Sequence, residues 1–426
     1  MLNGEKTFSH KQNKIIMNIL IINHYAGSPK MGMAYRPYYF AQEWIKKGHE
    51  VSILLANNSH IRQFNPEQTD TIREEFIDGI KYIWVKTPTY KGNGVGRIKN
   101  MFAFIKTGLS KARYLADTLK PNVVIASSTY TSDNYVARKI AKLANAKYLY
   151  EVHDLWPLSP MELGGMPKYH PFIVLMQHGE NFGYRKADAV ISMLPKTKEH
   201  MSAHGLDLNN WYYIPNGIVL SEWEELAELN EHTKTQILGI KSTFKTTIAY
   251  TGTLGLANAL DSFVLAAEKE RDVAFIMVGK GPEKERLQNL IKDKSLTNVF
   301  ILESINKQEI PSLLLMFDIL YIGLQSQSLF RFGISPNKLN DYMMAAKPII
   351  QAIDAGNNVV KEVGCGIYVE PENPSAIVEA VNQLKLTSKE DLEIMGQKGR
   401  DFVLKNHDYK ILAQQFIQVI EGISKS

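Results

Sequence analysis

The sequence contains little cysteine and no long hydrophobic run, and both absences narrow what the chain can be. A single cysteine, Cys365, excludes an internal disulfide framework, and no Cys/His cluster has the ligand spacing of a zinc site. The longest apolar stretch, residues 313–324, is interrupted by Asp318 and is shorter than the roughly 18 apolar residues of a membrane span. We therefore expect a cytoplasmic protein that does not cross a membrane and holds no metal.

An excess of charge of one sign is also missing. Lys and Arg total 49, Asp and Glu total 44, and the formal net charge is +5. This modest excess favours anionic ligands or lipids no more than simple solubility, and it gives no reason to expect a nucleic-acid partner. Residues 1–14 are polar and lack the apolar stretch of a secretory signal, while Met17 directly precedes the first predicted strand. Residues 1–16 are therefore either a disordered extension or the result of a misassigned start.

The length and the pattern of the remaining chain predict α/β structure in two domains. A chain of 426 residues exceeds what one hydrophobic core usually accommodates. Short β-branched runs alternate with amphipathic stretches such as residues 38–47 and 135–144. This alternation predicts a doubly wound parallel sheet with ligands at the carboxyl ends of its strands. The first series of predicted strands covers residues 18–23, 50–56, 123–127, 147–152 and 189–192.

A second series of strands follows the turn Ile214-Pro-Asn-Gly217 and the polar stretch 221–235. These turn residues mark the predicted domain boundary. We expect one Rossmann-like domain over residues 17–217, a second over 218–405, and a C-terminal helix over 406–426 that packs back on the first domain. The second series of predicted strands covers residues 247–251, 274–278, 299–302, 319–322, 348–352 and 366–369.

Two glycine-containing turns follow predicted strands. Gly27 and Gly32 come after the first strand, and Gly279 and Gly281 come after strand 274–278. A glycine loop that enters a helix can bring its backbone close to a phosphate or a sugar, although both turns also fit ordinary strand-to-helix connections. The spacing differs from G-x-G-x-x-G, which disfavours NAD.

The stretch from Phe330 to Asp341 carries more information, because a polar loop there leads into a helical pattern. Backbone N–H groups at a helix N-terminus favour a diphosphate, with Lys338 as a point charge and Asp341 facing hydroxyls about one turn on. An N-capped helix with Asp341 as its dipole partner is the alternative. In the first domain, Glu151-Val-His153-Asp154 closes a predicted strand and places His153 where open sheets bind ligands, or as an ordinary loop histidine.

Taken together, these stretches resemble the retaining glycosyltransferases of family GT4, whose GT-B architecture has two facing Rossmann-like domains. The resemblance covers nearly all of the chain after Met17. Ser335-Pro-Asn-Lys-Leu339, followed by Asp341-Tyr-Met343, is similar to the branch that builds bacterial surface polysaccharides and includes fucosamine transferases. The matching segments, in order, are Gly27 with Gly32, residues 47–51, His153, 214–217, 279–282, 335–348, 373–374 and 395–400.

The resemblance implies that the second domain holds a nucleotide sugar, expected to be UDP-linked, and that the first holds the acceptor. Asp341 takes the place of the second acid of the family's Glu-x7-Glu motif, which binds the ribose. The first acid is replaced by Gly333, so only backbone groups of Gly333 and Ile334 are left to contact the donor sugar there. The full set of donor-binding residues expected on this basis is Gly252, Thr253, Gly279, Gly281, Gly333, Ile334, Ser335, Pro336, Asn337 and Asp341.

Relatives also carry an Arg and a Lys after the first strand of the second domain, to neutralise the diphosphate. The corresponding segment here, residues 252–258, contains no cation. We expect Lys338 to supply much of that charge, with Gly252 and Thr253 offering close-approach backbone and a hydroxyl. The usual glycine before Lys347-Pro348 is Ala346, a smaller departure.

The expected reaction is transfer of a hexosyl or N-acetylhexosaminyl group to a glycan or a polyprenyl-diphosphate-linked acceptor, as in O-antigen, lipopolysaccharide or capsule synthesis. Fixed N–H donors and Lys338 would stabilise the departing diphosphate, and His153 would position the donor sugar or the acceptor. No Asp-x-Asp occurs, so neither a metal nor another cofactor is expected. Without an obvious carboxylate pair, front-face attack is favoured over double displacement. A nucleotide-sugar epimerase and an inactive sugar-nucleotide-binding protein are the alternatives.

A cationic stretch in the first domain bears on the acceptor. Residues 96–113 combine five cations with apolar side chains and contain no acid. A helix of this composition can lie on an anionic membrane, with Arg97, Lys99 and Lys106 at the surface, or it can simply pack on the sheet with its cations solvated.

Overall fold

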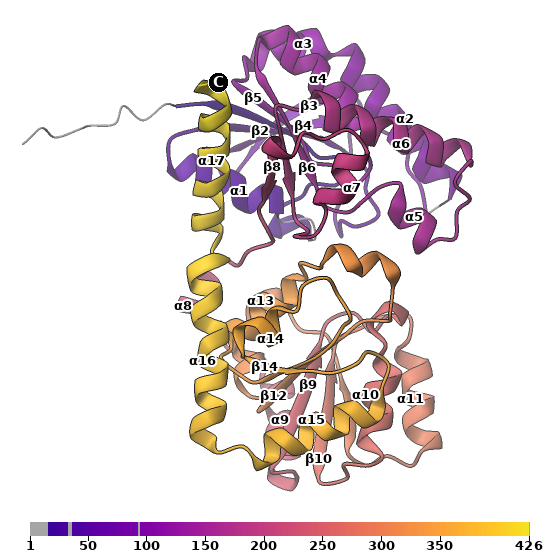
Figure 1. Ribbon diagram of the computed structural model, residues 1–426, viewed down its shortest axis with the longest axis vertical. Helices are drawn as coiled ribbons and strands as arrows, with labels where there is room; N and C mark the ends of the chain where they lie inside the picture. The colour runs from indigo at the N-terminus through magenta and orange to yellow at the C-terminus, as the bar shows by residue number, and fades with distance from the viewer. Residues whose placement is uncertain (1–15, 33–35, 93, 426) are drawn as a thin grey trace, which may run out of the picture. The chain divides into compact units, whose positions relative to one another are not determined.

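The computed structural model describes residues 16–32, 36–92 and 94–425. Their strands form an eight-stranded sheet and then a six-stranded sheet (Figure 1). Two compact units can be distinguished, one containing residues up to 126 with 136–148, the other containing 127–135 with 149 onwards. The predicted boundary at residue 217 lies between the last strand of the first sheet and the first strand of the second, and it stays a prediction. The expected extension over residues 1–16 lies outside the described residues, apart from Ile16.

The first sheet has the strand order β3-β4-β2-β1-β5-β6-β7-β8. Its central strands are mostly apolar because both of their faces are covered, as parallel sheets require. Ile19 of β1 pairs with Val51 of β2 on one side and with Val123 of β5 on the other. The strands are β1 Asn18–Ile22, β2 Glu50–Ala56, β3 Ile72–Ile77, β4 Ile80–Val85, β5 Val123–Ala126, β6 Lys147–Val152, β7 Ala189–Ser192 and β8 Trp211–Tyr213.

Three of these strands, β3, β4 and β8, were not expected from the sequence. β3 pairs antiparallel with β4, so the sheet is not purely parallel. The turn between them is Asp78-Gly79, and both residues have positive φ angles, 50° and 83°. An Asp-Gly pair of this kind is a strong hairpin signal, and β3 shows only partial burial because it lies at the sheet edge.

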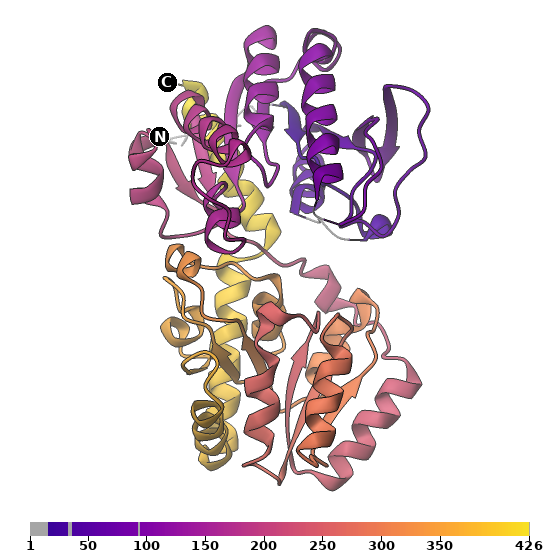
Figure 2. The same ribbon diagram turned by 90° about the vertical axis from the view of Figure 1, so that its right-hand side faces the viewer.

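Helices flank the strands of the first sheet (Figure 2). α1 buries Phe40 and Trp44, whose rings stack 5.5 Å apart, while its Gln and Lys side chains face outward. α2 likewise buries Met101, Phe104 and Ile105. The helices are η1 Pro29–Met31, α1 Arg36–Lys46, α2 Val95–Ser110, α3 Ala112–Leu119, α4 Asp133–Ala144, α5 Leu158–Glu162, α6 Pro171–Lys186, α7 Lys198–Ala203 and η2 Leu208–Asn210.

The second sheet has the order β11-β10-β9-β12-β13-β14, and each pair of neighbouring strands in it is parallel. One hydrophobic cluster packs on each face, the first around Phe317 and Tyr342, the second around Phe263 and Phe275. Every strand predicted for this region is present to within a residue. The strands are β9 Thr246–Thr251, β10 Val273–Val278, β11 Val299–Leu302, β12 Ile319–Gly323, β13 Ile349–Ala352 and β14 Gly366–Tyr368.

The helices of this region begin with short connecting elements and end with two long helices. Where the chain passes from the first sheet to the second, Ile218 N–H donates to the His407 carbonyl at 2.8 Å and Tyr409 N–H donates to the Ile218 carbonyl at 3.1 Å. The helices are α8 Ser221–Glu224, α9 Glu231–Thr243, η3 Leu256–Asn258, α10 Leu260–Ala267, α11 Lys284–Asp293, η4 Lys307–Glu309, α12 Ile310–Leu315, η5 Ser328–Phe332, α13 Asn337–Met344, α14 Val359–Val363, α15 Pro374–Leu386, α16 Lys389–Asn406 and α17 Tyr409–Lys425.

The C-terminal helix expected over 406–426 is α17, and its packing on the first domain stays a prediction. Within the described ranges, none of the helices combines the length with the apolar character that crossing a bilayer requires.

Candidate functional site

The strand orders indicate where each sheet can bind a ligand. In each sheet the strand order reverses at one point. The chain moves outward in one direction from β1 and in the other from β5 in the first sheet, and likewise from β9 and β12 in the second. Helices on either side of such a switch point leave a crevice at the carboxyl ends of the strands. The residues just after β1, β5 and β6, and those just after β9 and β10, are therefore the candidate site residues.

His153, predicted as a site residue, lies directly after β6 and belongs to a hydrogen-bonded group of three side chains. Ser127 follows β5, and its hydroxyl donates to Glu151 Oε2 at 2.6 Å. His153 Nε2 lies 3.1 Å from the same oxygen and 3.0 Å from Ser127 Oγ. Glu151 is buried, whereas the His153 side chain keeps 19% of its surface exposed. Because a carboxylate accepts hydrogen bonds, Nε2–H donates to Glu151, and Nδ1 is the nitrogen left to accept a hydrogen bond.

The glycine loop after β1 is built largely by packing, and its Lys30 lies 3.5 Å from Asp78. Gly27 is buried, and its carbonyl accepts the Tyr82 hydroxyl at 2.9 Å. Gly32 has a φ of 71°, and a Cβ there would lie 2.8 Å from Gln63. Beside the loop, burial lowers the pKa of His24 to about 3, so this ring is neutral. Gly32 therefore has a structural reason for being glycine, and the contact of Gly27 and Gly32 with an acceptor stays a prediction.

In the second sheet, the loops after β9 and β10 contact each other through their backbones. Gly252 N–H donates to the Val278 carbonyl at 3.0 Å, and Leu254 N–H donates to the Lys280 carbonyl at 2.9 Å. A Cβ on Gly279 would lie 1.9 Å from the Gly252 carbonyl oxygen, and one on Gly281 would lie 2.2 Å from that of Leu254. Only glycine fits at these two positions, which leaves Gly252 and Thr253 exposed at the end of β9.

Lys338, in the first turn of α13, reaches this same strand end. Its Nζ donates to the Tyr250 hydroxyl at 2.9 Å and lies 4.0 Å from the ring centroid. A Cβ on Gly252 would be only 3.0 Å from Nζ, so the ammonium group stands directly over the exposed backbone. Burial lowers the pKa of Lys338 to about 7. An anion at this point would restore the charge of the lysine.

The loop before α13 is fixed by two asparagines that the sequence analysis did not single out. Asn357 receives the Ile334 N–H at 2.7 Å and donates to the Ile334 carbonyl at 3.1 Å. Asn216 N–H donates to Ser335 Oγ at 2.9 Å. The Gly333 N–H is also used, because it donates to the Phe330 carbonyl at 2.8 Å. The expected donor contacts through the N–H groups of Gly333 and Ile334 would therefore have to compete with bonds that the chain already makes.

The remaining residues of this motif lie at the start of α13. Pro336 precedes the helix and Asn337 is its exposed first residue, while the Leu339 N–H of the first turn donates to the Pro336 carbonyl at 3.1 Å. Asp341 lies one turn on, near Trp223 and the ion pair between Lys307 and Glu222. Desolvation raises the pKa of the Asp341 carboxyl to about 7, so near neutral pH this carboxyl is partly protonated.

The cationic stretch of the first region forms α2 and the start of α3. Met101, Phe104 and Ile105 pack inward, as the alternative reading expected, while Lys99 and Lys106 are exposed. Arg97 does not join them, because its Nε donates to the Tyr25 hydroxyl at 3.1 Å and its guanidinium lies over the Tyr25 ring. The outer face also carries Val95 and Phe102, which are 66% and 51% exposed.

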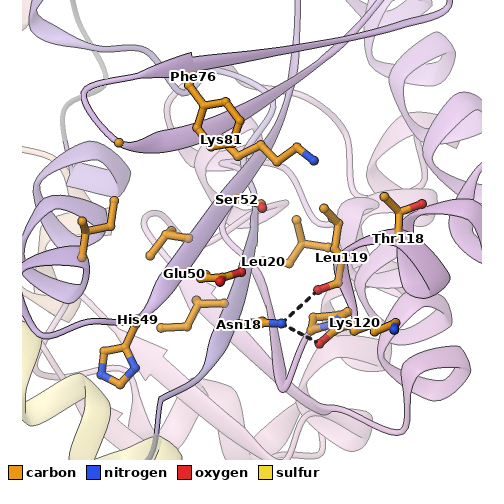
Figure 3. A pocket seen from close by; sticks show the side chains of 15 residues that line it. Asn18, Leu20, His49, Glu50, Ser52, Phe76, Lys81, Thr118, Leu119 and Lys120 are labelled. Carbon is orange, nitrogen blue, oxygen red and sulfur yellow. Dashed lines mark hydrogen bonds between the residues drawn. The ribbon is translucent and has the colours of Figure 1, made fainter.

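A cavity of about 510 Å³ lies at the other end of the first sheet, where its parallel strands begin (Figure 3). It is lined by residues at the amino ends of the strands, among them Asn18, Glu50 and Lys81. The Asn18 amide donates there to the carbonyls of Leu119 and Lys120, both at 3.3 Å. This cavity contains none of the predicted site residues, and strand polarity places it away from the ligand-binding edge.

The residues after β5 and β6 and those after β9 and β10 form two strand-end regions. Only some of the residues that build these regions could have been predicted from the sequence. Glu151 is a carboxylate inside an otherwise apolar strand, and that is a detectable signal. Two tyrosines hold α13 against β9. The Tyr342 hydroxyl of α13 accepts the Thr251 N–H at 2.8 Å, and the Tyr250 hydroxyl of β9 accepts a hydrogen bond from Lys338 of α13. The tyrosines match the helix and strand patterns of any core, so no local signal distinguishes them.

Comparison with known proteins assigns each half of the chain. Residues 31–217 match the family described as "Glycosyl transferase 4-like domain", and residues 233–402 match "Glycosyl transferases group 1". An Escherichia coli K12 protein named as a candidate colanic acid biosynthesis glycosyl transferase, WcaI, is 22% identical over 391 residues, which cover 89% of this chain and 94% of that protein.

Solved structures share the fold over nearly the whole chain. The Anabaena protein Alr3699/HepE in complex with UDP and glucose has a TM-score of 0.65 at 15% identity, covering 95% of this chain and 99% of that one. Sucrose-phosphate synthase from Thermosynechococcus elongatus has a TM-score of 0.71 at 13% identity, covering 96% and 99%. WaaG, a glycosyltransferase involved in lipopolysaccharide biosynthesis, has a TM-score of 0.64 at 13% identity, covering 95% and 100%. With both halves matched in order and the two-sheet fold present, the chain belongs to the glycosyltransferases of family GT4, which have the GT-B architecture of two Rossmann-like domains.

Proposed function

We propose that this protein is a retaining, metal-independent glycosyltransferase that uses a UDP-linked hexose or N-acetylhexosamine in the synthesis of a cell-surface polysaccharide. The observation that carries the proposal is the position of Lys338 Nζ over Gly252 at the end of β9, beside the N-terminus of α13. A cation and a helix N-terminus beside exposed backbone form a site for a diphosphate. Support for the donor comes from the fold neighbour with bound UDP, and support for the product comes from the names of WcaI and WaaG.

The residues after β9 and β10 have complementary roles in this proposal. Gly252 and Thr253 face the phosphates, Gly279 and Gly281 allow the two loops to pack closely, and Asp341 accepts a hydrogen bond from the ribose when it is ionised. Breaking the glycosyl–phosphate bond leaves negative charge on the diphosphate, and the Lys338 ammonium stabilises that charge. The proton that Lys338 lacks at neutral pH is taken up when the diphosphate binds.

His153 acts on the sugar or the acceptor. Glu151 and Ser127 hold the ring so that Nδ1 accepts a hydrogen bond from a hydroxyl group. The acceptor hydroxyl attacks the anomeric carbon from the face that the diphosphate leaves, and the departing phosphate takes the hydroxyl proton. Attack on this face retains the anomeric configuration. Purified protein with a series of UDP-sugars and a lipid-linked glycan tests this, with the product anomer read by NMR. An inverted product would contradict the retaining course, and donor turnover absent with every UDP-sugar would favour the inactive binding protein.

Metal independence is tested separately. Initial transfer rates should be unchanged by a chelator that removes magnesium and manganese, because leaving-group stabilisation is assigned to Lys338. Loss of activity on chelation, with recovery on addition of magnesium or manganese, would contradict this part of the proposal.

The acceptor is proposed to be lipid-linked, with α2 resting on an anionic membrane surface. Lys99 and Lys106 supply positive charge on the outer face of α2, and Phe102 and Val95 supply apolar contact. Arg97 is left out of the binding face because its guanidinium is held by Tyr25. Sedimentation with phosphatidylglycerol vesicles should fall with salt and in a Lys99→Ala, Lys106→Ala, Phe102→Ser variant. It should not fall when the exposed Lys91 and Lys142, which lie outside α2, are changed to alanine. Equal loss in both variants, or no binding, would favour a soluble acceptor.

A further inference from the structure

Three metal-binding side chains converge outside the strand-end regions described above. Glu180 lies on α6, and His200 and His204 lie four residues apart on α7 and its C-terminal cap. One ligand atom from each lies within 4.8 Å of the other two. His200 Nε2 is 3.0 Å from Glu180 Oε1, and the two imidazole rings are 4.6 Å apart. The sequence analysis did not single out this histidine pair, because the third side chain, Glu180, comes from another helix.

The buried Glu180 carboxylate is held by Gln177, Tyr184 and His200 rather than by a lysine or an arginine. Its side chain is only 1% exposed, and among the ion pairs of the described residues its partner is His200, with no lysine or arginine. Tyr184 donates its hydroxyl to Glu180 Oε1 at 3.0 Å. A carboxylate removed from water is costly unless a positive charge compensates it, and a bound cation would provide that charge.

Further polar atoms gather around the His204 ring. Gln177 Nε2 lies 2.6 Å from Glu180 Oε2, 2.9 Å from Asn181 Oδ1 and 3.0 Å from His204 Nδ1. Asn181 Oδ1 and His204 Nδ1 are themselves 3.0 Å apart. Nitrogen and oxygen atoms of the kinds that bind transition metals therefore lie close together where α6 meets α7.

We propose that Glu180, His200 and His204 bind a divalent transition-metal ion, zinc in particular, as a structural site that ties α6 to α7. Two imidazoles and one carboxylate are a ligand set that zinc accepts, with water or Asn181 Oδ1 in the fourth position. Ligand atoms on tetrahedral zinc lie about 3.3 Å apart, given bonds of about 2.0–2.1 Å, so small side-chain rotations have to close the set. Gln177 then orients Glu180 from outside the ligand set.

The test uses the full-length protein, stripped with a chelator and titrated with zinc chloride in a calorimeter. We expect one zinc ion per chain, a rise in the melting temperature on zinc addition, and, with cobalt instead of zinc, the intense visible absorption of tetrahedral coordination. His204→Ala should weaken zinc binding by at least about 100-fold. Glu180→Gln, which is nearly isosteric, should do the same if His204→Ala folds poorly.

The matched control is His178→Ala, on the same helix α6, where His178 is hydrogen-bonded to Tyr135 and lies outside the ligand set. This variant should bind zinc as the unchanged protein does. Absence of zinc binding would overturn the proposal and leave Glu180 and His200 as an ion pair alone. Zinc binding that survives both ligand substitutions, or that is lost equally in His178→Ala, would overturn it as well.

Discussion

The carboxyl edges of the two sheets present different atoms to a ligand. After β5 and β6, three side chains, Ser127, Glu151 and His153, are bonded to one another. After β9 and β10, the surface is largely backbone, and the cation that lies over Gly252, Lys338, comes from α13. In the first region a ligand meets a side chain held by other side chains. In the second it meets main-chain atoms that only glycines allow to approach.

This difference separates two kinds of sensitivity to mutation. Substitution in the second region collides with backbone that cannot move cheaply, so folding and donor binding are lost together. Substitution in the first region changes the orientation of one imidazole and leaves the sheet intact. The predictions below use this contrast and are ordered from the largest expected effect to the smallest.

Gly279→Ala should have the largest effect. The new Cβ would lie 1.9 Å from the Gly252 carbonyl oxygen, so the loops after β9 and β10 must separate. We expect a loss of stability of about 3 kcal/mol and no measurable turnover. Gly239→Ala is the control, since a Cβ there meets nothing within 4 Å in the helix α9, and it should stabilise slightly. Chemical denaturation measures both, and a Gly279→Ala protein with normal stability would contradict the packing argument.

Lys338→Met should separate activity from stability. Turnover should fall on the order of a hundredfold or more, because the diphosphate loses its cation. The pKa of Lys338 is about 7 in the fold, below its ordinary 10.5, so the unfolded chain binds more protons between these values. The cost of burying the charged lysine is therefore fully present below pH 7 and fades as the pH rises toward 10.5. The melting temperature of the variant should exceed that of the unchanged protein by the largest margin at or below pH 7. Near-normal turnover would remove Lys338 from the mechanism.

Glu151→Gln should have the smallest effect of the three. The amide still fills the space beside Ser127, but it no longer holds His153 as a carboxylate does, and turnover should fall by up to about a hundredfold. Because Glu151 is assigned a positioning role through His153, the double variant with His153→Ala should be no slower than His153→Ala alone. Additive losses in this cycle would show that Glu151 acts independently of the imidazole.

Sequence patterns predicted the second sheet better than the first, and the reason is physical. The four inner strands of the second sheet, β9, β10, β12 and β13, are buried along nearly their whole length, so each reads largely as a short apolar run. β3, with the sequence IREEFI, lies at an edge and is half exposed, and β8 is three residues long, so neither gives such a run. The Asp78-Gly79 turn indicates a β-hairpin, and β3 and β4 could have been predicted from it.

The candidate site shows the same limit. Lys338 and the glycines could be predicted because the chemistry they serve needs those residue types after a strand. Asn357 could not, because it fixes Ile334 from 23 positions away, and only the fold brings the two together. The occupied N–H groups of Gly333 and Ile334 were likewise invisible in the sequence. Arg97 was counted with Lys99 and Lys106 because spacing alone does not reveal that Tyr25 lies beside it.

The most direct test of the central claim is a calorimetric titration of UDP into the protein at pH 8, in two buffers with different ionisation enthalpies. If the diphosphate binds at the end of β9 beneath Lys338, whose pKa is about 7, binding should take up close to one proton per UDP. The same titration of Lys338→Met should show weaker binding and no proton uptake. UDP binding of equal affinity in both proteins, without a difference between the two buffers, would contradict the assignment of Lys338 to the donor diphosphate.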